Sequence, residues 1–168
     1  MRPTELNTKL HGPIGKWDVS QVTNMNMLFF GFRTFNYDLS NWGVSRVTEM
    51  RSMFAYAYYF DQDLSKWDVS RVTDMGAMFN RAHAFNQDLS NWDVSRVSDM
   101  ESMFSYADSF NQDLSNWDMS RVTSMREMLA NTKNFNQDLS RWDVSRVCLL
   151  YTSPSPRDYA ASRMPSSA

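Results

Sequence analysis

The sequence predicts an α/β repeat solenoid in which every 25-residue coil carries one short parallel strand and one short helix. The first observation is a tryptophan that recurs without a slip, at Trp17, Trp42, Trp67, Trp92, Trp117 and Trp142. A strict period of this length is typical of a chain built from stacked coils. The second observation is that the spacing of apolar residues changes within each repeat, first to two and then to three or four.

The predicted strand covers residues 66–70 and the equivalent residues of the other repeats. Leu64, Trp67 and Val69 follow the L-x-x-L-x-L spacing of a leucine-rich repeat, which makes the expected coil leucine-rich-repeat-like. Trp67 and Val69 stand two residues apart, as in a strand with one buried face. We therefore expect the tryptophans to point inward. The alternative is a row of exposed indoles that stack on sugars.

The predicted helix follows the strand. Thr73 is the expected N-cap and Asp74 the first-turn acid that offsets the positive end of the helix dipole. The apolar stripe behind them has helical spacing and consists of Met75, Met78, Phe79 and Ala82. The threonine column has a second interpretation, an ice-binding ladder on a flat face. The acidic residue after most of these threonines favours caps.

Three segments are predicted: a lead-in at 1–13, the repeats at 14–147 and a tail at 148–168. The tail is rich in Ser and Pro and carries no period, so we expect it to be disordered. It resembles translated adaptor sequence, and a native linker is the alternative. We expect a fragment of a longer array, with neighbouring repeats as partners. No run is long and apolar enough for a signal peptide or a membrane span, so no membrane insertion is expected.

The composition excludes several classes of function. A net charge of −2 argues against a nucleic-acid partner, which needs clustered Lys and Arg. The single cysteine, Cys148, excludes a disulfide framework. His11 and His83 stand at non-equivalent positions, and no phosphate loop or nucleophile-and-base pair occurs, so we expect neither an enzyme nor a cofactor. A polysaccharide-active parallel β-helix is a distant alternative.

The alternation of a strand predicts the outward face. If Trp67 and Val69 point inward, then Lys66, Asp68 and Ser70 point outward. The first outward column is Lys16, Asn41, Lys66, Asn91, Asn116 and Arg141. The candidate binding face also includes Asp68, Asp93, Asp118, Ser70, Ser95 and Ser120.

Two aspartate columns need an explanation, because like charges at strand spacing repel. In the structural interpretation each Asp accepts a hydrogen bond from the backbone or from the Ser two residues on. The alternative is a row of calcium sites, with help from Asp38, Asp63, Asp88, Asp113 and Asp138. The structural interpretation is favoured and no metal site is predicted, so calcium is expected to leave the melting temperature unchanged.

Residues 85–104 closely resemble the repeat of BspA-like bacterial surface proteins, which recurs in mycoplasma-type lipoproteins. The resemblance covers about 14–147. It implies a surface or extracellular location and a role in adhesion or protein binding. Gly43 departs from the pattern, since other coils carry Asp there, and no lipobox is present. We therefore expect a non-enzymatic interaction module with a protein or glycan partner. The alternative is a spacer or surface coat without a specific ligand.

Overall fold

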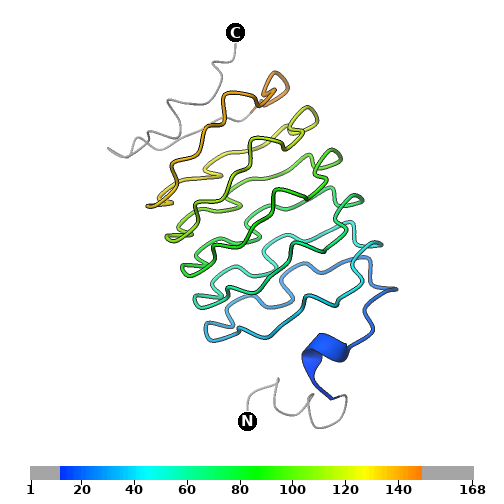
Figure 1. Ribbon diagram of the computed structural model, residues 1–168. Helices are drawn as coiled ribbons and strands as arrows, with labels where there is room; N and C mark the ends of the chain where they lie inside the picture. Colours follow the sequence, from blue (N-terminus) through cyan, green and yellow to red (C-terminus); the bar gives the residue numbers. More distant parts are fainter. Residues whose placement is uncertain (1–11, 149–168) are drawn as a thin grey trace.

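The computed structural model describes residues 12–148, which form a stack of flat coils (Figure 1). Residues 35–59, 60–84, 85–109 and 110–134 each make one complete coil, and part of a coil lies at either end. The first and last described residues lie at opposite ends of the stack. Contacts between neighbouring coils therefore repeat at sequence separations near the 25-residue period.

Regular secondary structure is almost absent, and the predicted α/β leucine-rich-repeat-like solenoid is wrong. Within residues 12–148 the one helix is the 3-10 turn η1 (Ile14–Lys16). Extended pairing in this part of the chain is limited to isolated parallel bridges, with no sheet. The bridges join Asn24 to Glu49, Glu49 to Asp74, Asp74 to Asp99, and Asp99 to Ser124.

The segment predicted as a strand is a short extended piece between two turns. The amide of Trp67 donates to the Leu64 carbonyl at 3.0 Å, and the amide of Val72 donates to the Val69 carbonyl at 2.9 Å. Only residues 67–69 remain between these turns, and their backbone forms no bridge to a neighbouring coil. The predicted alternation still holds, because Trp67 and Val69 are buried and Asp68 is exposed.

The segment predicted as a helix is a run of successive turns bonded to the next coil. The amides of Met75, Ala77, Phe79 and Arg81 donate to carbonyls 24 residues on, at 2.7 to 2.9 Å. The amides of Met78 and Asn80 donate three residues back, to Met75 and Ala77 at 3.1 Å, and the Gly76 amide donates to Asp74 Oδ1. Ala77 and Arg81 have positive φ, 54° and 59°, which alternates the direction of the amides.

The turns replace the helix because they satisfy more of the backbone. A helix of two turns leaves four amides and four carbonyls without partners at its ends. In the turn run, alternate amides bond within the coil and the others bond to the adjacent coil. The side chains predicted for the helix stripe are nevertheless buried, including Met75, Met78 and Phe79.

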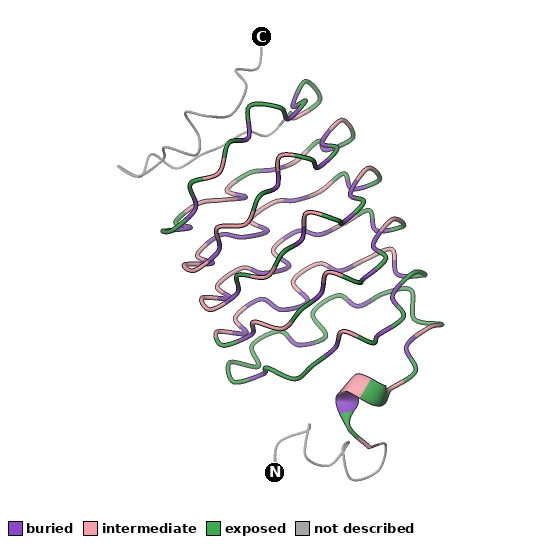
Figure 2. Ribbon diagram, in the orientation of Figure 1, coloured by how far each residue is buried: buried purple, intermediate pink, exposed green. Residues whose placement is uncertain are grey.

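Phenylalanines form two columns through the core. Phe79 and Phe85 stack within one coil with ring centroids 4.0 Å apart. Between coils, Phe79 stacks on Phe54 at 5.7 Å and Phe85 stacks on Phe60 at 5.9 Å. Figure 2 shows buried residues alternating with half-buried and exposed ones along each coil, and mainly exposed residues in the coil at the N-terminal end. The core is therefore continuous along the stack.

Each coil is also tied to the preceding one by its tryptophan. The Nε1 of Trp67 donates to the Leu39 carbonyl at 3.0 Å, and that of Trp92 donates to Leu64 at 3.0 Å. Trp42, Trp117 and Trp142 make the same bond. The predicted inward orientation is confirmed for these tryptophans, and the sugar-stacking alternative is wrong for them because the indoles are buried.

The threonine column bonds the coils rather than capping helices. The Oγ1 of Thr73 donates to the Thr48 carbonyl at 3.2 Å, and Thr48 donates to Thr23 in the same way. The predicted N-caps are wrong because no helix follows them. The acid after Thr73 instead accepts a bond two residues on, from the Gly76 amide to Asp74 Oδ1 at 2.7 Å.

Candidate binding surface

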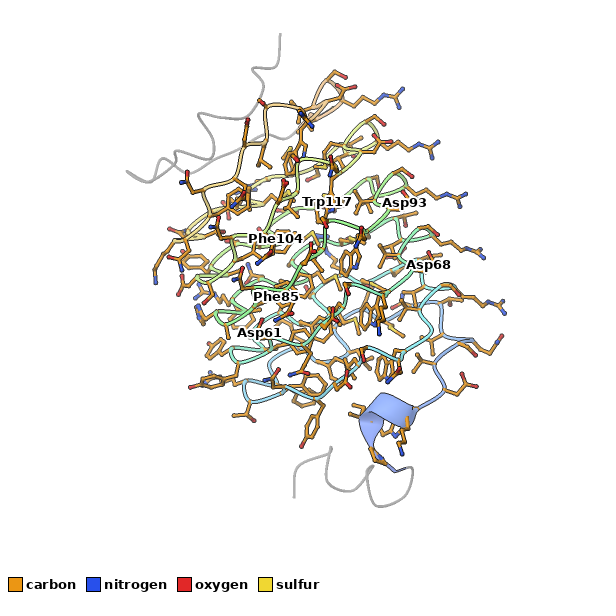
Figure 3. The ribbon with its side chains drawn as sticks, viewed as in Figure 1. Asp61, Asp68, Phe85, Asp93, Phe104 and Trp117 are labelled. Carbon is orange, nitrogen blue, oxygen red and sulfur yellow. The ribbon has the colours of Figure 1, made fainter. Side chains whose placement is uncertain are left out.

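The predicted outward positions lie on one edge of the stack, which we call the outward edge. Lys66 and Asp68 are exposed and Ser70 is half-buried. Figure 3 shows Asp68 and Asp93 one above the other at this edge, with Asp61 on the other side of the stack. The other candidate residues of the first column are exposed as well: Lys16, Asn41, Asn91, Asn116 and Arg141.

The expected aspartate–serine bond is confirmed in both acidic columns. Asp68 Oδ1 accepts bonds from the Ser70 amide at 3.1 Å and from Ser70 Oγ at 2.6 Å. Asp63 accepts from the Ser65 amide at 2.8 Å in the other column. Asp93 and Asp118 accept the amides of Ser95 and Ser120 at 3.0 Å. Each aspartate thus closes a local turn.

These hydrogen bonds stabilise the ionised carboxylates. The Ser95 side chain and amide lower the pKa of Asp93, and Arg96 adds a smaller electrostatic effect. The pKa values lowered for the same reason belong to Asp18, Asp38, Asp63, Asp113, Asp118 and Asp143. Repulsion between adjacent aspartates acts the other way, as Asp118 does on Asp93, and it is the smaller effect.

We expect the melting temperature to fall when the pH drops below about 4. A carboxyl whose pKa is lower in the folded state stabilises the fold above its unfolded pKa, near 3.8, and this contribution is lost as pH falls through the folded pKa. Circular dichroism melts between pH 7 and pH 2 test this. A rise in melting temperature upon acidification would contradict it, because relief of repulsion along the columns would then dominate.

No metal centre is seen in the described part of the chain. Among residues 12–148, no group of three or more His, Cys, Asp and Glu side chains converges as metal ligands would. The calcium titration remains the test of the alternative for the aspartate columns.

The first outward column differs from the other polar columns because its asparagine side chains do not hydrogen-bond to the rest of the described chain. Within residues 12–148 the side chains of Asn41, Asn91 and Asn116 make no hydrogen bond. Lys66 interacts only electrostatically, with Asp38 and Asp63. Asparagine amides that are exposed and unused remain available to a partner.

A cavity of about 500 Å³ lies at the N-terminal end of this column. It is lined by Pro13, Ile14, Gly15, Lys16, Tyr37, Asp38 and Asn41. Trp42 holds η1 against the coil at 35–59 by a 2.9 Å bond from its Nε1 to the Ile14 carbonyl. Gly15 is required there, because a Cβ would overlap the Asp38 carbonyl oxygen. The cavity thus combines an aromatic ring with ammonium, carboxylate and amide groups.

The sequence analysis did not anticipate an asparagine ladder on another flank of the stack. Asn86 Oδ1 accepts bonds from the Asn111 amide and from Gln112 Nε2, both at 2.9 Å. Asp61 holds the equivalent position and accepts from Asn86 and Gln87. The recurring Asn-Gln pair was the available signal, but its acceptor lies 25 residues away.

We expect Asn86→Ala to lower the free energy of unfolding by about 1 to 2 kcal/mol, because two donors lose their acceptor. Asn86→Asp is the matched control and is expected to cost much less, since Asp61 makes the same contacts. Urea denaturation measures both. Equal losses for the two variants would show that the ladder contributes nothing through its acceptor.

Arg51 joins three coils across a glycine. Its Nη1 lies 3.2 Å from Asp74 Oδ1 and 3.0 Å from Asp99 Oδ2, and Nη2 lies 3.5 Å from Glu101. Partial burial opposes the charge, but these carboxylates outweigh it and raise the guanidinium pKa. The arginine reaches the third coil because Gly76 has no side chain: a Cβ there would overlap the guanidinium.

A further column holds a different residue in every coil. Arg33 lies over the Tyr58 ring at 5.3 Å, and the Tyr58 and His83 rings lie 5.0 Å apart. Asp108 Oδ2 then lies 3.0 Å from His83 Nδ1 and 3.0 Å from Lys133 Nζ. Each member of this column contacts its neighbours in the adjacent coils. These specific contacts favour the observed stacking of the coils over one in which a coil pairs with a different repeat.

The adjacent column contains a cation between aromatic rings. The Arg81 guanidinium lies 4.3 Å from the Tyr106 centroid and 5.5 Å from the Tyr56 centroid. The sequence showed that these positions vary from coil to coil, but it could not show that the variable residues contact one another. The side chains of these two columns therefore interact largely with one another.

Comparison with known proteins identifies the family. The model of a family described as "Mycoplasma protein of unknown function, DUF285" matches residues 4–111 and again residues 59–152. The chain belongs to this family. No curated protein and no solved structure matches it.

Membership of the DUF285 family confirms the resemblance at the level of the mycoplasma-type repeat. Within residues 12–148 of this DUF285 chain, no helix has the length and hydropathy needed to cross a bilayer. The predicted segment limits at 13, 14, 147 and 148 stay predictions, and residues 1–11 and 149–168, with most of the expected lead-in and tail, lie outside the described residues.

Proposed function

We propose that the chain is a non-enzymatic interaction module whose outward edge contacts a protein or glycan partner. The observation that carries this proposal is the first outward column, whose asparagine side chains are exposed and make no bond within residues 12–148. The other polar columns are used within the fold: the aspartates close turns inside a coil, and the Thr and Asn columns bond neighbouring coils. A regular row of unused donors and acceptors suits an extended partner.

The cavity at the end of this row supports the same proposal. Ligand pockets are typically about 300 to 1,000 Å³, apolar for the most part, with a few polar groups. The Tyr37 ring offers a flat apolar surface, and Asp38 and Asn41 offer hydrogen bonds. This chemistry suits a sugar ring or the side chain of a partner protein.

The proposal extends to location. The BspA-like resemblance of residues 85–104, together with DUF285 membership, supports display at the cell surface or outside the cell. Nucleic acid is not a proposed partner, because aspartates alternate with the basic residues of the outward edge.

Array binding with a paired variant tests the function. Asn91→Ala combined with Asn116→Ala is expected to abolish most of the binding to protein or glycan arrays and to leave the melting temperature unchanged. Asn134→Ala is the matched control, because Asn134 is exposed, lies off this edge and its side chain makes no hydrogen bond in the described chain. Equal signals from both variants would count against the outward edge.

A structural spacer or surface coat is the second candidate. It is favoured by the threonine and asparagine columns, whose side chains bind coil to coil and leave little for a ligand. This candidate predicts no specific signal on either array from the unmodified chain.

A further inference from the structure

The N-terminal end of the stack exposes apolar side chains, and the equivalents of Val22, Leu28 and Phe32 are buried in each complete coil. We define the N-terminal end face by Val22, Met27, Leu28, Phe30 and Phe32. Leu28 is 44% exposed, whereas its equivalents Met53 and Met78 are 0% exposed. Val22 is likewise 36% exposed, against 0% for Val47. Val22 and Leu28 therefore occupy positions that belong to the core in the following coils. They are exposed because no preceding coil within residues 12–148 covers them.

The same end presents a row of backbone acceptors. In the coil at 35–59, the carbonyls of Glu49, Arg51, Met53 and Ala55 accept amides of the preceding coil at 2.8 to 2.9 Å. The equivalent carbonyls at the end face belong to Asn24, Asn26, Leu28 and Phe30. No amide within residues 12–148 donates to them.

The opposite end presents the matching donors. The amides of Met100, Ser102, Phe104 and Tyr106 donate to the coil that follows, at 2.8 to 2.9 Å. Their equivalents at the last described turn run are the amides of Met125, Glu127, Leu129 and Asn131. None of these four donates to a carbonyl of the described chain. One end therefore offers acceptors and the other offers donors at the same spacing.

Side-chain size also matches between the two ends. The bulky Phe30 and Phe32 are followed in the next coil by Ala55 and Ala57, which are buried. The equivalent positions of the last full coil hold Ala130 and Thr132. A coil carrying these residues offers the end face nearly the same small side chains that the second coil already packs next to it.

We propose that the N-terminal end face binds the C-terminal end of a second copy of this chain, head to tail. Such a contact uses two different surfaces and does not close, so it produces linear assemblies rather than a symmetric dimer. An unpaired row of backbone groups beside apolar side chains is a known template for this pairing. The inference concerns the stack ends and does not depend on the outward edge.

Sedimentation velocity with the full chain over a wide concentration range tests the assembly. The average mass is expected to rise with concentration through successive multiples of one chain. Leu28→Lys is expected to weaken association by at least about tenfold, because a charge is placed in an apolar contact. Met27→Lys is a second variant, at a side chain that is 56% exposed and so tolerant of change.

Tyr59→Lys is the matched control, since Tyr59 is 64% exposed but lies on a flank of the second coil. This variant is expected to associate like the unmodified chain. A monomer at every concentration would overturn the proposal, and that is the result expected if another segment of the same chain covers the end face. A dimer that grows no further, or equal association by all variants, would also overturn it.

Discussion

Replacement of Trp92 by alanine is expected to lower the free energy of unfolding by about 3 to 5 kcal/mol. Trp92 is 3% exposed, and its ring lies 6.3 Å from that of Phe79 in the preceding coil. The change removes a large buried ring from the middle of the stack and leaves the Leu64 carbonyl without its donor. Urea denaturation followed by circular dichroism measures the loss.

Two further variants separate the causes of this loss. Trp92→Phe keeps one buried aromatic ring and removes the Nε1 donor and part of the indole, so it is expected to cost less than Trp92→Ala, about 1 to 3 kcal/mol. Trp17→Ala changes the equivalent residue at the end of the stack, where the indole is half-buried, and is expected to cost less than Trp92→Ala. Equal costs at Trp17 and Trp92 would contradict a core that is continuous through the central coils.

Replacement of Gly76 by alanine is expected to cost about 1 kcal/mol, because the new Cβ overlaps the Arg51 guanidinium and displaces it from its carboxylate partners. The backbone itself accepts a side chain, since Asn26, Arg51, Glu101 and Arg126 hold the equivalent positions. The arginine must therefore leave Asp99 and Glu101, and the link between the first and third of these coils is lost. Thermal and urea denaturation measure the change.

A double-mutant cycle isolates this effect. In an Arg51→Ala background, Gly76→Ala is expected to cost only a fraction of its effect in the unmodified chain, with the close approach to Asp74 as the remaining cost. Gly43→Ala is the control for a glycine with room, because its Cβ would meet only Ser20 Cβ at 3.8 Å. Additive losses in the cycle would show that Arg51 and Gly76 act independently.

The sequence was sufficient to predict which side chains point inward and which point outward, but it did not predict the backbone conformation. Trp67, Val69, Met75 and Phe79 are buried as predicted, although neither the strand nor the helix that justified them exists. A spacing of i, i+3, i+4 indicates which side chains share a face. Here a run of turns with two positive-φ residues four positions apart, such as Ala77 and Arg81, presents the same face as a helix, so the pattern could not distinguish them.

Local bonds of the candidate surface were predictable and distant bonds were not. The aspartate–serine turns span two residues, and the residue types alone indicate them. The bond from Arg51 to Asp99 spans 48 residues and depends on the missing side chain of Gly76 between them. No spacing rule shows that a glycine in one coil opens a path for an arginine of another.

The sequence by itself determined the period, the core-facing residues and the aspartate turns, because these follow from side-chain polarity and short-range geometry. Only the tertiary structure decided how each coil satisfies its backbone. The amides of Phe79 and Arg81 donate to the next coil, where a helix would have used them internally. The neighbouring coil accepts hydrogen bonds from alternate amides of the turn run. A short isolated helix would leave the amides of its first turn without acceptors.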